Sequence, residues 1–301
     1  MAHARELEWL RSSVGVFSPP DRTLISIGGD DARTWLQGQL TNQCEGLKPG
    51  ESVYGFILSL KGRVMADAWA YFHDTGVWLE VPNTGVDALM DRLDRYIIME
   101  DVDLEHRPGL SVLTAQGPRS DEVVTRAWPS DRLGAGGLAW LVDRAELAVE
   151  LERASERAAA VGGGRMSEEA WRAVHVAFGR PLFGVDFGDW TYPQETGLTA
   201  AAVSFNKGCY VGQETVVMLQ NRGKAPKLLW RWEVEGSAPP EPKTPITRGG
   251  AQVGEVTSSA VVDGATRALG FLKRGQEAER DGFEIQDRTA RPIGPVSAGP
   301  A

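Results

Sequence analysis

Cysteine, positive charge and long apolar runs are all scarce in this sequence. Cys44 and Cys209 are the only cysteines in 301 residues, too few for a disulfide framework and in keeping with a reducing compartment. No run approaches the roughly 18 apolar residues of a membrane span, and the first residues, "MAHARELEWLRSS", lack the apolar core of a signal peptide. We therefore expect a cytoplasmic protein with no membrane partner.

The charge balance and the missing motifs exclude several further classes. With 32 Lys and Arg against 41 Asp and Glu, the formal charge of −9 argues against broad, direct nucleic-acid binding, which needs many cations to neutralise phosphates. The 4 histidines lie far apart and never pair with a cysteine at ligand spacing, so we expect no metal site. No C-x-x-C, H-E-x-x-H or G-x-S-x-G occurs, which leaves a dithiol redox site, a zinc protease or a serine hydrolase without a motif.

The apolar pattern predicts a mixed α+β chain of two or three structural units. A strand over 23–29 precedes a helix over 32–40 that Asp30 or Asp31 can cap, and two strand-like runs around Gly62 form a hairpin. Further strands are predicted at 76–82, 110–117, 138–142 and 145–151, and helices at 84–98, 152–160 and from Ser167 to near Gly179.

The residue pattern of the chain changes after Pro226. Short alternating strands separated by turn residues predict a small, separate β-barrel. We assign residues 1–225 to two interleaved α+β units, 226–290 to the barrel and 291–301 to a flexible tail rich in Pro and Gly.

The stretch "KGCYVGQE", residues 207–214, gathers a cation, a thiol, a phenol, an amide and a carboxylate around two glycines. If a helix begins near Gly212, its N-terminus together with Lys207 would lower the pKa of the Cys209 thiol and make it reactive. Alternatively "TVVML" is a strand and Cys209 is a small buried apolar residue. The residues by themselves leave both interpretations open.

The same stretch resembles the signature of the YgfZ family, folate-binding relatives of the glycine-cleavage T-protein. Other segments are similar to that family in the same order: "GDDARTWLQGQLTNQ", "LSLKGRVMADAWAY", "WRAVHVAFGRPLFGVD", "YPQETGL", "GEVTSSA" and "ALGFL". The resemblance implies a T-protein-like fold in which an α+β unit, a ferredoxin-like unit and a C-terminal β-barrel surround a central hole that admits tetrahydrofolate.

The resemblance also implies a function. Family members support assembly or repair of iron-sulfur clusters in [4Fe-4S] enzymes and thereby affect tRNA modification, so the implied partners are a folate and iron-sulfur client enzymes or cluster carriers. Two alternatives stay open: a folate-dependent aminomethyltransferase or demethylase, and a noncatalytic folate-sensing scaffold. The T-protein pterin motif G-Y-T-G-E is missing, and only Asp67 stands where T-proteins have an Asp pair, which weakens the transferase alternative.

Candidate site residues follow from the resemblance and from the chemistry of folate. A carboxylate that accepts two pterin N–H groups is expected from Glu195 or Glu214, and the anionic glutamate tail is expected at Lys207, Arg222 or Lys224. The alternative for Glu195 is an ordinary acid in a loop, and the alternative for Glu214 is an acid at the start of a helix. Arg222 and Lys224 alternatively belong to a solvated loop. The remaining candidates are Cys209 as a tentative catalytic thiol, Tyr210 for stacking or core packing, Gln213 within the motif, and Arg63 with Asp67, which either line the hole or form a surface ion pair.

Overall fold

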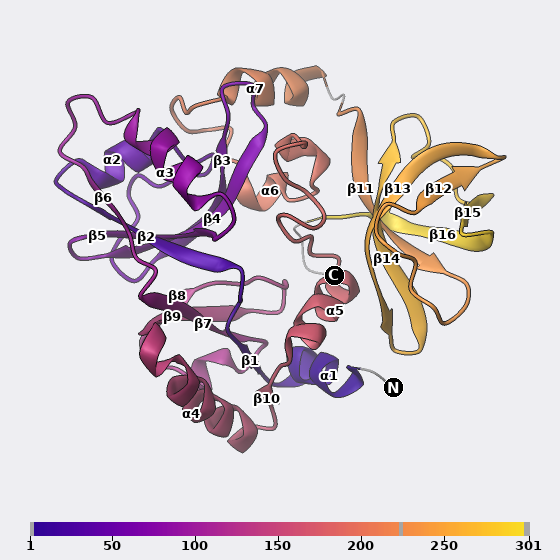
Figure 1. Cartoon of the computed structure of the whole chain (residues 1–301), viewed down its shortest axis with the longest axis horizontal. Helices are drawn as coiled ribbons and strands as arrows, with labels where there is room; N and C mark the ends of the chain where they lie inside the picture. The colour runs from indigo at the N-terminus through magenta and orange to yellow at the C-terminus, as the bar shows by residue number, and fades with distance from the viewer. Residues whose placement is uncertain (1–2, 223–224, 298–301) are drawn as a thin grey trace.

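Two five-stranded sheets and a closed barrel make up the computed structural model, which describes residues 3–222 and 225–297 (Figure 1). The first sheet has the strand order β3-β4-β5-β2-β6 with antiparallel neighbours. Helices α2 and α3 cover one face, where Trp35, Leu36 and Leu89 pack on strand residues such as Ile25 and Leu79. The elements are β2 (Arg22–Gly28), α2 (Ala32–Gln37), β3 (Ser52–Leu58), β4 (Val64–His73), β5 (Gly76–Pro82), α3 (Val86–Asp94) and β6 (Asp103–His106).

The second sheet has the order β10-β1-β7-β9-β8 and carries α4 on its outer face. Its inner face packs on the first sheet through one apolar cluster, in which Leu24 and Tyr71 meet Val112 and Ala139. The elements are α1 (Ala4–Ser12), β1 (Gly15–Phe17), β7 (Leu110–Gln116), β8 (Trp128–Pro129), β9 (Gly137–Asp143), α4 (Leu147–Ala160) and β10 (Gly164–Arg165).

A long connecting segment joins the sheets to the barrel and runs through the middle of the molecule (Figure 1). It comprises α5 (Glu168–Phe178), α6 (Thr199–Ala202) and α7 (Gln213–Arg222). As predicted, the Ser167 side chain caps α5 by accepting a hydrogen bond from the Ala170 N–H, and Gly179 ends that helix in a left-handed conformation.

The C-terminal barrel closes in the order β11-β14-β13-β12-β15-β16. Its strands are β11 (Lys227–Val234), β12 (Pro245–Arg248), β13 (Ala251–Val262), β14 (Ala265–Lys273), β15 (Phe283–Ile285) and β16 (Arg288–Pro295). Trp232, Ile246 and Phe283 fill its core. Asp186 fastens the barrel to the connecting segment, because its buried carboxylate accepts hydrogen bonds from the hydroxyls of Thr257 and Ser258.

Two sequence-based predictions of local structure are wrong. Residues 145–151 are not a strand but enter helix α4, because Leu151, Ala154 and Ala158 recur at helical spacing and are buried against the second sheet. The range 291–301, predicted to be a tail, begins inside strand β16, whose pairing with β11 closes the barrel.

Candidate functional site

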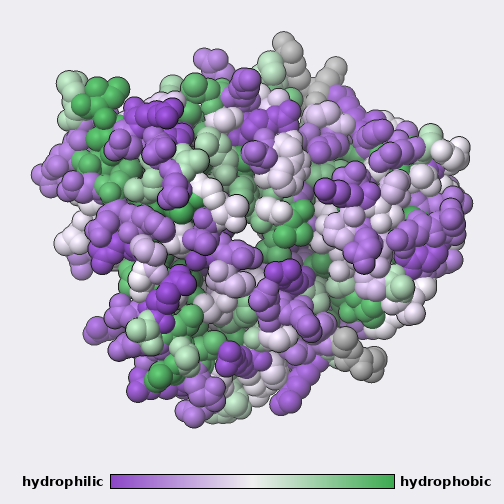
Figure 2. Space-filling model, in the orientation of Figure 1, coloured by the Kyte–Doolittle hydropathy of each residue, from purple (hydrophilic) through white to green (hydrophobic). Residues whose placement is uncertain are grey.

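A cavity of about 1010 Å³ lies where the two sheets and the connecting segment meet. Figure 2 shows the corresponding hollow near the centre of the molecule. Its volume is at the upper end of the range for small-molecule sites. Aromatic side chains of Tyr54, Trp69, Phe183 and Trp190 contribute to its lining, so the cavity offers flat apolar surfaces to a ring-shaped ligand.

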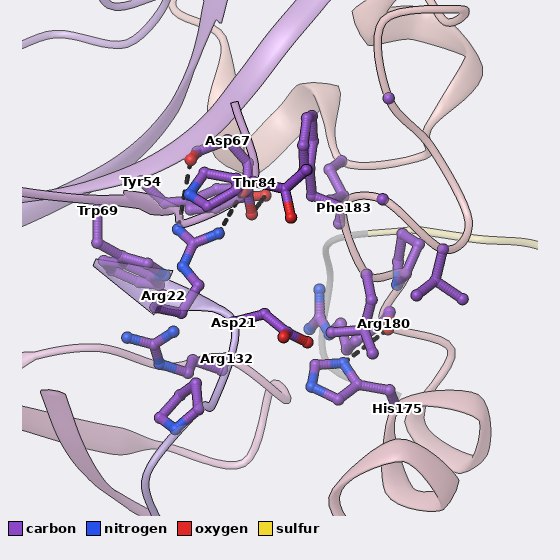
Figure 3. Close-up of a pocket in the computed structure, with 18 of the residues that line it drawn as sticks. Asp21, Arg22, Tyr54, Asp67, Trp69, Thr84, Arg132, His175, Arg180 and Phe183 are labelled. Atoms are coloured by element: carbon purple, nitrogen blue, oxygen red, sulfur yellow. Dashed lines mark hydrogen bonds and ion pairs between the residues drawn. The ribbon is translucent and has the colours of Figure 1, made fainter. Parts of the chain in front are cut away.

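Asp67 presents a carboxylate to this cavity from strand β4. Arg22 Nη1 donates to Asp67 Oδ1 at 2.5 Å, and the Tyr54 hydroxyl donates to Oδ2 at 3.0 Å (Figure 3). Each carboxylate oxygen can accept a further hydrogen bond. The carboxylate is therefore held in one orientation and still has acceptor capacity for a ligand.

Glu80 anchors these groups from the adjacent strand β5. Its fully buried carboxylate accepts hydrogen bonds from Arg22 Nε at 2.9 Å, from Arg132 Nη2 at 2.5 Å and from the Tyr71 hydroxyl at 2.6 Å. Burial alone would raise the pKa of Glu80, but the charges of Arg132 and Arg22 outweigh it and lower the pKa to about 2. The carboxylate thus stays ionised and holds both arginines at the cavity wall.

His175 lies on the other side of the cavity from Asp67 and extends from helix α5 (Figure 3). Its Nδ1 is 2.8 Å from the carbonyl oxygen of Arg180. Burial lowers the pKa of His175 to about 3, helped by the charges of Arg132 and Arg180 and opposed by the hydrogen bond to the carbonyl. The imidazole is consequently neutral at physiological pH.

Lys207, expected to bind an anionic folate tail, is directed at the backbone instead. Its Nζ donates to the carbonyl oxygens of Gln37 and Leu40 at 2.6 Å and of Asn42 at 2.8 Å. Burial lowers the pKa of Lys207 to about 8. These three bonds tie the 207–214 segment to the end of helix α2, where carbonyl groups lack intrahelical partners.

The glycines of the motif allow two backbones to approach closely. Gly212 has a φ of +82°, and a Cβ there would lie 2.5 Å from the Ser59 carbonyl oxygen in the β3–β4 turn. Gly62 in that turn has a φ of +75° and would meet Thr215 in the same way. The interpretation of "TVVML" as part of a helix is the one confirmed, because α7 begins at Gln213.

Apart from Asp67, the sequence-predicted candidates whose side chains are described do not line the cavity. Cys209 is exposed, Tyr210 is buried in an apolar cluster, and Glu214 is exposed on the first turn of α7. The Gln213 Oε1 accepts a bond from the Tyr210 N–H at 3.3 Å. The side chain of Arg222 and all of Lys224 lie outside the described residues.

Glu195 and Arg63 serve local structure. The Glu195 carboxylate is buried and accepts a 2.8 Å hydrogen bond from the Tyr192 N–H, and its burial raises its pKa. Arg63 donates to the Trp190 carbonyl and stacks 3.9 Å from the centre of the Tyr192 ring. The sequence leaves two alternatives for Arg63 and Asp67, a shared lining of the hole or a surface ion pair. In the structure Asp67 lines the cavity and pairs with Arg22, whereas Arg63 is directed at Trp190 and Tyr192.

Sequence reasoning missed Arg22, Tyr54, Glu80, Arg132 and His175. One signal was present for Glu80. It is an acid in the middle of the apolar run "GVWLEVP", and a charge buried in a central strand requires a cationic partner. Nothing in the spacing indicates that Arg22 and Arg132 are those partners.

Within the described residues, no cluster of three or more His, Cys, Asp and Glu side chains is arranged to hold a metal ion. Across residues 3–222 and 225–297, every helix is too short or too polar to cross a membrane.

Comparison with known proteins identifies the family. Residues 1–155 match the family described as the GCVT N-terminal domain. The chain belongs to this family. Its relatives include proteins named tRNA-modifying protein YgfZ, in keeping with the resemblance found in the sequence.

Two of these relatives illustrate the extent of the match. The YgfZ protein of Vibrio atlanticus is 28% identical over 209 residues, which cover 67% of this chain and 64% of the relative, less than two thirds of its length. The YgfZ protein of Aliivibrio fischeri is 25% identical over 282 residues, covering 89% of this chain and 87% of the relative.

A solved structure shares the architecture. The glycine cleavage system aminomethyltransferase T from Bartonella henselae superposes with a TM-score of 0.82 over 97% of this chain and 88% of its own, at 16% identity. Together with the closed barrel, this likeness confirms the expected α+β, T-protein-like arrangement of three units around a central hole.

Proposed function

We propose that this protein binds tetrahydrofolate in the central cavity and supports assembly or repair of iron-sulfur clusters in [4Fe-4S] enzymes. The observation that carries the folate part is the Asp67 carboxylate, which Arg22 and Tyr54 hold at the wall of a cavity of about 1010 Å³. A pterin offers adjacent N–H donors to such a carboxylate. The aromatic side chains of Trp69 and Phe183 supply surface for its ring.

The iron-sulfur part rests on family membership and on one exposed group. Relatives are named tRNA-modifying proteins. Enzymes that depend on an iron-sulfur cluster would connect cluster assembly or repair to tRNA modification. Cys209 is exposed, so a client protein or cluster carrier could reach its thiol without entering the cavity. A cytoplasmic location, expected from the sequence, fits this role.

Calorimetry with tetrahydrofolate tests the binding step. We expect wild-type protein to bind and Asp67→Asn to bind about 10-fold to 100-fold more weakly, because a hydrogen bond to a charged group contributes about 1.5–3 kcal/mol. Asp74→Asn is the matched control, since this exposed acid lies between β4 and β5 and outside the cavity lining. A wild-type protein that shows no binding would refute the proposal.

A complementation experiment tests the cellular step. In cells without this protein, the activity of a [4Fe-4S] enzyme under oxidative stress should recover with wild type but not with Asp67→Asn. Full recovery with Cys209→Ala would remove the thiol from the mechanism. Incubating the purified protein with tetrahydrofolate and methyl donors gives a separate check, because a one-carbon product would favour a transferase.

A further inference from the structure

The charges around Asp67 are balanced within the protein itself. Arg22 Nη1 donates to the Asp67 carboxylate at 2.5 Å, and Arg22 Nε donates to the Glu80 carboxylate at 2.9 Å (Figure 3). Arg132 donates to the two oxygens of Glu80 at 2.9 and 2.5 Å. Two carboxylates therefore face two guanidinium groups, and this four-residue cluster carries no net charge.

Arg22 is fixed in the cluster through all of its nitrogen atoms. Besides the bonds of Nη1 and Nε, its Nη2 donates to the backbone carbonyl oxygens of Asp67 at 3.3 Å and of Glu80 at 3.2 Å. The side chain of Arg22 is 11% exposed and that of Asp67 is 13% exposed. The guanidinium would have to break several bonds to turn away, so its positive charge stays beside Asp67.

This balance decides which charge a ligand can bring to Asp67. A neutral N–H donor adds hydrogen bonds and leaves the net charge of the cluster unchanged. A cation adds an uncompensated charge where little water is present, which is costly, and Arg22 repels it. A carboxylate without an arginine beside it would have the reverse preference, because the cation would then compensate its charge.

We propose that Arg22 is a specificity-determining residue, which makes the cavity select a ring that donates hydrogen bonds while uncharged and reject a ring that must be protonated to do so. The inference rests on the proposed function and deepens it, because it names the substrate class. A 2-amino-4-oxopteridine presents two adjacent N–H donors while neutral. A 2,4-diaminopteridine presents such a pair only after a ring nitrogen is protonated, since that nitrogen is otherwise an acceptor.

The 4-amino analogue of tetrahydrofolate is a matched probe, because it exchanges only the 4-oxo group for an amino group. Calorimetry in the absence of oxygen compares the two compounds. We expect wild-type protein to bind tetrahydrofolate at least about 10-fold more tightly than the analogue. Equal or tighter binding of the analogue would overturn the inference while leaving folate binding intact. Absence of tetrahydrofolate binding would overturn both proposals.

The pH dependence of analogue binding to wild type is a readout that needs no variant. A ring that binds as a cation binds more tightly as the pH falls from about 9 to about 6, because binding then takes up a proton. We expect the affinity of wild type for the analogue not to rise on acidification. A rise would show that the cavity accepts the cation, and it would overturn the inference.

The protein groups with shifted pKa values do not obscure this readout. Glu80, with a pKa of about 2, and His175, with a pKa of about 3, keep one charge state over this range. Burial raises the pKa of Tyr54, which stays a neutral donor to Asp67. The other charged groups of the lining are carboxyl and guanidinium groups, those of Asp21, Asp131, Glu168, Arg172, Arg180 and Asp189.

Arg22→Gln removes the positive charge and keeps an amide that can donate to Asp67. We expect the preference for tetrahydrofolate over the analogue to shrink at least about 10-fold in this variant, and its affinity for the analogue to rise as the pH falls. Arg107→Gln is the matched control and should keep the wild-type preference, because Arg107 pairs with Glu105 outside the cavity lining. An unchanged preference in Arg22→Gln, with folding checked by its melting temperature, would overturn the inference. The pH series on wild type decides even where Arg22→Gln fails to fold.

Discussion

The cavity wall contains buried ionisable groups and the 207–214 segment contains the half-buried Lys207, and the two regions satisfy these groups with different partners. In the wall, Arg22 and Arg132 share Glu80, and Arg22 also holds Asp67, so side chains of opposite charge satisfy one another. In the segment, Lys207 is surrounded by backbone carbonyls. The wall can therefore hold a charged group toward a ligand, whereas the segment uses its cation to join two parts of the chain.

The largest expected effect is a loss of stability when the buried ion pairs of the cavity wall are broken. Glu80→Gln preserves the shape of the side chain but removes the charge that Arg22 and Arg132 share, and breaking a buried ion pair costs about 3–5 kcal/mol. We expect a loss of that order in the free energy of unfolding, measured in urea. Glu105→Gln is the control, because its pair with Arg107 is exposed and should contribute far less. Equal losses in the two variants would contradict the assigned role of Glu80.

Acid should remove the same stabilisation in the wild type. The pKa of Glu80 is about 2 in the folded protein and ordinarily 4.5. A carboxylate with a lowered folded pKa stabilises the fold while it is ionised, so its contribution is complete above about pH 5 and is lost as the pH falls toward 2. The difference in urea midpoint between wild type and Glu80→Gln should shrink over this range. A difference that is independent of pH would argue against an ionised Glu80.

A substitution of Lys207 in the 207–214 segment should change the free energy of unfolding and leave ligand affinity unchanged. Lys207→Met leaves three carbonyl oxygens without their donor, and we expect unfolding to become easier by about 2–3 kcal/mol. The affinity for tetrahydrofolate should not change, since Lys207 lies outside the cavity lining. Lys48→Met, at an exposed position, is the matched control. Weaker binding at unchanged stability would instead support the role that the sequence suggested for Lys207.

The smallest effect is expected at the thiol. Cys209→Ser should alter the free energy of unfolding by less than about 0.5 kcal/mol, because the side chain is exposed. Iodoacetamide should label Cys209 in the native protein and spare Cys44, which is buried and whose pKa burial raises to about 12. Mass spectrometry would count one adduct on native wild type and none on Cys209→Ser. Labelling of native Cys44 would show that the core around it opens readily.

Local structure was predictable where a single segment contains its own signal. Ser167 and Gly179 bound helix α5 as their residue types indicate, and the positive φ of Gly62 turns the β3–β4 hairpin. The strand predicted at 145–151 failed because the apolar residues that decide its conformation extend to Ala158, beyond the window considered.

The site was less predictable for a related reason. The 207–214 stretch is dense in reactive groups, yet Lys207, Tyr210 and Gln213 make packing and backbone contacts, and none of the stretch lines the cavity. The groups that meet at the cavity come from distant segments with no recognisable motif. Asp67 was found because the hairpin places it on one face of β4. His175 was not, because an apolar helical face does not reveal that one ring nitrogen will lack a partner.

Periodicity, turn residues and recognisable motifs were enough to indicate the family, the order of strands and helices over most of the chain, and the presence of a C-terminal barrel. Which charged side chains pair with one another depends on the folded arrangement of the sheets. Arg22 and Asp67 are 45 positions apart, and Arg132 and Glu80 are 52 apart. Such pairs form because strand register and sheet packing bring their side chains together, and no local pattern specifies that geometry.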